Sequence, residues 1–314
     1  MFNDLSLHGQ FASAREFLAA LGWLMSARQR VEKAQMQLRC HRGFLQAQAT
    51  GTQRVGDIVR ELGDRSRRRQ IMAWINKRPF WEDERLHAGD EYFEVAGEIV
   101  TDTAVGEAAT AVAEGASRTL VSTQPSSWLR TPIEVTHFLS DEQRAMIPVP
   151  NVWNDDQLER ALREAEPPVQ SWADLVAWAG RTCPHLFLAD DVIASLDGWP
   201  FMANAAEGLQ IRLKTLDRMR ACSTEDGGLN DEGLGLRETY FVGKKAWFSD
   251  SSDREKNQFE HELTFKHPGE SDKTLFCPWH GKVKIKQMRI HFSWPIIANE
   301  PIYVVYMGPK ITKR

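Results

Sequence analysis

Residues 273–314 contain three short segments in which apolar and polar residues alternate. Alternation with a period of two is typical of a β-strand that has one buried and one exposed face. In the first two segments the polar positions carry mainly lysine, arginine or histidine, so a sheet built from them would present one apolar and one basic face. The sequence therefore predicts a small C-terminal sheet with a cationic face. The basic positions are Lys282, Lys284, Lys286, Arg289 and His291.

Charge is divided unevenly between this segment and the rest of the chain. Residues 273–314 hold eight lysines and arginines and one acid, Glu300, whereas the preceding residues hold 31 basic and 42 acidic residues. An overall net charge of −4 argues against non-specific binding of nucleic acid by the whole surface. A local basic patch can still bind phosphate. The C-terminal segment is therefore the predicted binding region.

Helical signals dominate the first two thirds of the chain. A capping box at Ser13–Glu16, followed by a regular apolar stripe, predicts a helix that ends near Arg39. The strongest later stripe predicts a helix over residues 201–222. A hairpin of two short strands is expected near residues 91–101. Residues 1–225 are therefore predicted to form a mainly helical region with one small hairpin.

The pattern changes after this region. Residues 224–235 are rich in glycine and acidic residues and have no periodicity, which is typical of a boundary between domains. Beyond them the pattern is almost entirely that of β-structure, so residues 236–314 are predicted to form a basic, β-rich domain. The expected fold class is α+β, with a mainly helical N-terminal region followed by a small basic β-rich C-terminal domain.

Signals for a membrane or for secretion are absent from the sequence. No run of 18 apolar residues occurs, and the N-terminal residues lack the basic and apolar parts of a signal peptide. The four cysteines are scattered without a close pair, which fits reduced thiols better than a disulfide framework. We therefore expect a cytoplasmic protein without a membrane partner.

The common catalytic motifs are also missing. Walker, dinucleotide-binding, nucleophile-elbow and helical zinc-protease patterns do not occur. Cys277 and His280 form a Cys-x-x-His pair, which supplies only two of the four ligands that a structural zinc ion needs. Near Lys282, Cys277 would also be a stabilised thiolate nucleophile. Neither interpretation is favoured, and no cofactor or metal is predicted.

Two further charged clusters have both a functional and a structural interpretation. Arg65–Arg69 would contact phosphate, although the solvated face of a helix is the commoner origin of such a cluster. The carboxylates of residues 83–98 would bind a divalent metal in a nuclease site. The strand pattern of many metal nucleases is missing, so a solvated acidic surface is favoured for this segment.

The basic segment offers acid–base and electrostatic chemistry on phosphate. His280 and His291 are of a type that exchanges protons near neutral pH, and Arg289 with the nearby lysines would stabilise a phosphate attacked by the 2′-hydroxyl of RNA. Trp279 flanks these residues and would stack on bases. A basic strand face that only binds nucleic acid or an acidic partner explains the same residues equally well.

The segment Met288-Arg-Ile-His-Phe-Ser-Trp294, followed by Ile302-Tyr-Val-Val-Tyr-Met-Gly308, resembles the terminal hairpin of RelE/HigB-type bacterial toxins. The resemblance covers residues 280–314 and implies a small α/β sheet and metal-free cleavage of mRNA by basic and aromatic residues. Arg289 matches the strand arginine of that family, Lys310 the basic residue after the last strand, and Tyr306 is the nearest to its terminal tyrosine. A helical region before a basic β tail is also similar to uncharacterised bacterial phage-defence proteins.

These observations predict an RNA-directed effector, either a metal-independent ribonuclease or a toxin-like component of bacterial antiviral defence. The alternative is a non-enzymatic nucleic-acid-binding or adaptor subunit, which would act with a protein partner in a defence complex. The expected catalytic residues are His280, Arg289, His291 and Tyr306. The expected nucleic-acid-binding residues are Lys282, Lys284, Lys286, Lys310 and Trp279.

Overall fold

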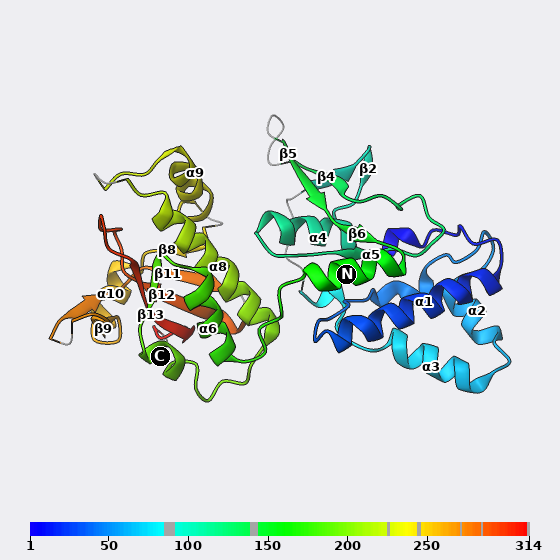
Figure 1. Ribbon diagram of the computed structural model, residues 1–314, viewed down its shortest axis with the longest axis horizontal. Coiled ribbons are helices and arrows are strands. Elements are labelled where there is room, and N and C mark those ends of the chain that lie inside the picture. The colour runs from blue at the N-terminus through cyan, green and yellow to red at the C-terminus, as the bar shows by residue number, and fades with distance from the viewer. Residues whose placement is uncertain are drawn as a thin grey trace. The chain divides into compact units, whose positions relative to one another are not determined.

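The computed structural model describes residues 1–84, 92–138, 144–224, 227–243, 246–270, 272–283 and 285–312, without the side chain of Glu84. Helices lie mostly in the N-terminal and middle parts of the described chain, and strands cluster toward its C-terminal end (Figure 1). The predicted α+β class is thereby confirmed. The chain divides into two compact units, Met1–Pro168 and Val169–Arg314.

The first unit begins with a group of helices around one buried apolar cluster. The first of them starts as the capping box predicts, because Ser13 Oγ accepts a hydrogen bond from the Glu16 backbone N–H at 3.3 Å. It ends at Lys33, short of the expected Arg39. The helices of this group are α1 (Ala14–Lys33), α2 (Val55–Glu61), α3 (Arg65–Ile75) and α5 (Asp155–Glu164).

An antiparallel sheet with strand order β2-β1-β4-β5 completes the first unit, and α4 packs on it. The hairpin expected near residues 91–101 is present, with Glu94 paired to Ile99 and Val95 to Glu98. A short parallel pair, β3 with β6, lies outside this sheet. The elements are β1 (Tyr92–Val95), β2 (Glu98–Ile99), α4 (Ala104–Ala113), β3 (Leu120–Val121), β4 (Ile133–Phe138), β5 (Arg144–Val149) and β6 (Asn151–Val152).

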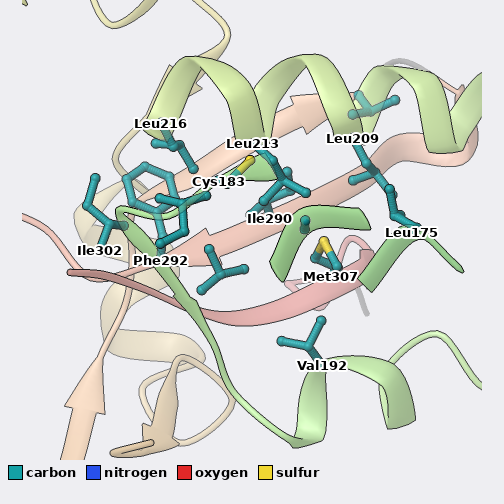
Figure 2. Packing of buried hydrophobic residues seen from close by; sticks show 14 of the residues in the cluster. Leu175, Cys183, Val192, Leu209, Leu213, Leu216, Ile290, Phe292, Ile302 and Met307 are labelled. Atoms are coloured by element: carbon teal, nitrogen blue, oxygen red, sulfur yellow. The ribbon is translucent and has the colours of Figure 1, made fainter. Parts of the chain in front are cut away.

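The second unit is built on a five-stranded sheet with the order β7-β13-β12-β11-β8. Only the β7–β13 pair is parallel among the described pairings of this sheet. Figure 2 shows Leu209, Leu213 and Leu216 of α8 directed toward the strand residues Ile290 and Phe292. The strands are β7 (Leu186–Leu188), β8 (Phe248–Ser249), β11 (His280–Val283), β12 (Met288–Phe292) and β13 (Ile302–Pro309).

Further elements surround this sheet. Helix α8 comes especially close to it, because a Cβ atom added at Gly208 would lie only 2.7 Å from Cγ1 of Val283. A separate two-stranded ribbon is formed by β9 and β10. These elements are α6 (Trp172–Thr182), α7 (Asp191–Ala194), α8 (Ala203–Ala221), α9 (Asp231–Tyr240), α10 (Asp253–Gln258), β9 (Thr264–Lys266) and β10 (Thr274–Phe276).

The C-terminal part contains more helix than the sequence pattern predicts. The expected boundary at residues 224–235 lies inside the second unit, since α8 packs on the C-terminal sheet. Asn230 caps α9 by accepting a hydrogen bond from the Gly233 backbone N–H at 2.9 Å. Ser252 caps α10 in the same way. Local capping chemistry therefore forms two helices where glycine content and the lack of periodicity suggested a loop and strands.

Candidate functional site

One face of the C-terminal sheet carries five of the side chains that the sequence singled out. In the register of β11, β12 and β13, His280 lies opposite His291, Lys282 opposite Arg289, and His291 opposite Tyr306. Side chains alternate along a strand, so all five lie on the face opposite the core that α8 covers. We call His280, Lys282, Arg289, His291 and Tyr306 the basic face.

A second layer covers part of the basic face. Figure 1 shows α10 and β9 on the side of the strands opposite α8. Phe265 of β9 lies against the rings of His291 and Tyr306, at centroid distances of 6.0 and 6.3 Å. This cover leaves His280 9% exposed and His291 2% exposed. The face is therefore a half-enclosed site rather than an open surface.

Main-chain carbonyl groups hold both imidazole rings of the basic face. Nδ1 of His291 lies 2.9 Å from the carbonyl oxygen of Cys277, and Nδ1 of His280 lies 3.2 Å from that of Pro278. A carbonyl oxygen only accepts hydrogen bonds, so each Nδ1 carries the proton. In the neutral ring each Nε2 is consequently an acceptor. The two ring centroids are 5.4 Å apart.

Burial keeps these rings neutral at physiological pH. It is the main cause that lowers the pKa of His280 to about 4 and that of His291 to about 3, and the charge of Arg289 contributes to both shifts. Burial also raises the pKa of Tyr306 to about 12, and its hydroxyl donates a hydrogen bond to the Pro309 carbonyl at 2.7 Å. Neither imidazole has a proton to donate from Nε2 at pH 7, which does not favour the general-acid role expected from the sequence.

The charged residues Lys282 and Arg289 face each other directly across β11 and β12. Burial, Arg289 and Lys310 lower the pKa of Lys282, and burial lowers the pKa of Arg289. Within the described residues no carboxylate lies within ion-pairing distance of either side chain, and Arg289 Nε is buried without a hydrogen-bond partner. Like charges directly opposite in an antiparallel pair are destabilising. The pair therefore costs stability unless an anion joins it.

A carboxylate of α10 lies beside this cluster. Glu255 Oε1 accepts hydrogen bonds from Lys310 Nζ at 2.8 Å and from Thr312 Oγ1 at 3.1 Å. The hydrogen bond from Lys310 is the main cause that lowers the pKa of Glu255 to about 2. Its negative charge also acts on Arg289 and His280. Lys310, which the sequence placed after the last strand, is thus linked to the basic face through the carboxylate of Glu255. We call this carboxylate the internal anion.

Two other expected binding residues, Lys286 and Trp279, lie away from the basic face. Lys286 is exposed in the turn η4 (Ile285–Gln287) with a φ of 51°, because β11 ends before it and the chain reverses there. Trp279 packs among aromatic rings of the core, 5.1 Å from the ring centroid of Trp294. The alternation in sequence predicted that Lys286 lies on the basic strand face, and this prediction is wrong. Lys284 lies outside the described residues.

The structure also bears on the metal and nucleophile hypotheses. Cys277 is fully buried, and burial raises its pKa to about 12, so it is a thiol rather than a thiolate at neutral pH. In the acidic segment 83–98, Asp83 forms an ion pair and Glu94 accepts a hydrogen bond from the hairpin, while residues 85–91 are outside the described part. No group of three or more potential ligands suited to a metal ion occurs among the described side chains.

Two residues of the site were not anticipated from the sequence. Glu255 supplies the internal anion, and Phe265 covers His291 and Tyr306. The spacing Ser252-x-x-Glu255 is a capping-box pattern and is a readable signal for α10. Its contact with Lys310, 55 residues later, has no local signal.

Comparisons with protein-family models, with curated proteins and with solved structures found no match to this chain. The resemblance to RelE/HigB-type toxins therefore stays a prediction from the residues of β12 and β13. Within the part of the chain that the structure describes, no helix combines the length and the apolar character needed to cross a membrane.

The buried histidines should make the protein less stable in mild acid. Their pKa values in the folded state lie below the ordinary 6.5, so the unfolded chain binds more protons and stability falls as the pH drops from about 6.5 toward 4. Each ring contributes up to about 1.4 kcal/mol per pH unit to the change in the free energy of unfolding. We expect His280→Gln to flatten this dependence, measured by urea unfolding across that range. Titration of either ring near pH 6.5 in an NMR experiment on the folded protein would contradict the burial.

Proposed function

We propose that the basic face binds nucleic-acid phosphate, with RNA as the favoured partner, and that the protein is a nucleic-acid-binding or adaptor subunit. The observation that carries this proposal is the direct opposition of Lys282 and Arg289, half-buried and without a carboxylate partner among the described residues. A phosphate beside them would supply the missing negative charge and accept hydrogen bonds from both side chains.

The distribution of charge supports a polyanion as the ligand. Residues 273–314 carry eight basic residues and one acid, and one of these cations, Lys310, lies close enough to Lys282 to lower its pKa. Several phosphate contacts of this kind produce strong, salt-dependent binding. The resemblance of residues 280–314 to RelE/HigB-type toxins favours RNA over DNA and is the basis for proposing a role in bacterial defence, with a protein partner in the adaptor case.

Metal-independent cleavage of RNA is a second candidate at the same face. It is supported by the cross-strand pair of His280 and His291, whose ring centroids lie 5.4 Å apart beside Arg289. Burial of both rings and their low pKa values oppose efficient proton transfer at neutral pH. Binding without cleavage is for this reason the function we put first.

Removing one cation of the central pair should weaken RNA binding. We expect Lys282→Gln and Arg289→Gln each to reduce the affinity for a labelled single-stranded RNA by about tenfold or more. Each should also reduce the slope of log affinity against log salt concentration by about 0.7. Fluorescence anisotropy at several salt concentrations measures both quantities. Lys286→Gln is the matched control, because it removes the same charge from the exposed turn and should have a much smaller effect.

Equal effects of all three variants would contradict a site at the basic face. Incubating the same RNA with the protein in excess EDTA separates the two candidate functions. Binding without cleavage supports the adaptor, whereas cleavage that survives EDTA and is lost in Arg289→Gln supports the ribonuclease. Cleavage that EDTA abolishes would reject both and indicate a metal nuclease.

The internal anion should compete with RNA. Glu255→Gln removes the carboxylate bound by Lys310 while keeping a residue that can complete the capping box of α10. We expect it to raise RNA affinity by several-fold, on the order of one ion pair's contribution. Asp253→Asn removes the same charge from a side chain of α10 that is 98% exposed and serves as the control. An equal gain in both variants would show a general charge effect and not competition at the site.

A further inference from the structure

A second basic site lies in the first unit and is independent of the basic face. A hollow of about 520 Å³ is lined by residues of α2, α3 and the turn η2 (Arg42–Gln46); α2 and α3 are neighbours in Figure 1. Three arginines and one carboxylate line it, Arg54, Arg60, Arg68 and Asp57. Sites for small molecules have volumes of roughly 300–1,000 Å³, so the hollow has the size of such a site.

Neighbouring groups leave the arginines of this hollow only partly neutralised. Asp57 accepts a hydrogen bond from the Arg54 backbone N–H at 3.2 Å and pairs with Arg60 Nη1 at 3.1 Å. Among the described residues no carboxylate pairs with the guanidinium of Arg54 or Arg68. Arg68 Nη2 donates to the carbonyl of Leu62, and its Nε is buried without a partner. A held guanidinium with an unused donor favours an anionic ligand.

The remaining lining of the hollow is largely apolar. Leu45, Val59 and Met72 contribute to it. Gly56 allows α2 to approach η2 closely, since a Cβ atom there would lie 3.1 Å from the Leu45 carbonyl oxygen. A ligand that uses the whole hollow needs an anionic group for the guanidinium groups and an apolar or aromatic body for these side chains.

We propose that this hollow binds a phosphomonoester with an aromatic or apolar body, of the size of a nucleoside monophosphate. Guanidinium groups bind phosphate oxygens through two parallel hydrogen bonds, and a phosphomonoester offers more negative charge and more acceptor oxygens to several arginines than a carboxylate does. The cluster Arg65–Arg69 contributes Arg68 to the site, whereas Arg65 and Arg69 are exposed and do not line it.

Isothermal titration calorimetry of the full chain with AMP tests the proposal. We expect Arg54→Ala and Arg60→Ala each to weaken AMP binding by about tenfold or more, the effect of losing a charged hydrogen-bond donor. Arg65→Ala and Arg69→Ala remove the same charge from positions of α3 that do not line the hollow and should leave the affinity nearly unchanged. Adenosine, which lacks the phosphate, and inorganic phosphate, which lacks the apolar body, should each bind more weakly than AMP.

Absence of AMP binding at millimolar concentration would overturn the proposal. Equal weakening by the variants of Arg54 and Arg60 and by those of Arg65 and Arg69 would overturn it as well, because binding would then follow net charge. So would binding of an RNA oligonucleotide, but not of AMP, through Arg54 and Arg60. Lys282→Gln should leave AMP binding unchanged, so this site and the basic face are tested separately.

Discussion

The packing of α8 against the C-terminal sheet determines where the side chains of β11, β12 and β13 point. Because this contact buries Ile290 and Phe292, alternation sends Arg289 and His291 to the opposite face. A shift of one residue in the strand register would exchange the two sets and place charged groups against α8. The cations of the basic face are thus held together by an apolar contact in which they take no part.

Burial then determines which reactions the side chains of the basic face can take part in. The two imidazoles lose their charge, with pKa values of about 4 and 3, whereas Arg289 retains its charge in any protein environment. A half-buried site with fixed cations and neutral imidazoles suits anion binding better than proton transfer. Glu255 offsets part of the positive charge, because it accepts a hydrogen bond from Lys310 and its charge acts on Arg289.

Local patterns predicted part of this arrangement. Alternation was sufficient to place Arg289 and His291 on one face, since it is a property of a single strand, and periodicity was sufficient to find α8. The register that sets Lys282 opposite Arg289 is fixed by the turn between β11 and β12, which alternation alone does not reveal. The cover by Phe265 and the partner sheet of α8 depend on residues distant in sequence, so no local pattern could reveal them. For Lys286 the local pattern gave a wrong prediction. The alternation of apolar and basic residues continues in the sequence through a turn where the strand has already ended.

The central claim is that the opposition of Lys282 and Arg289 serves to bind a ligand and lowers the stability of the folded protein. Replacing both by methionine, an unbranched side chain without charge, tests this in one protein by urea unfolding and RNA binding together. We expect the double variant to be more stable than the natural protein, by about 1 kcal/mol or more, and to lose its affinity for RNA. A less stable variant that binds RNA with unchanged affinity would contradict the claim.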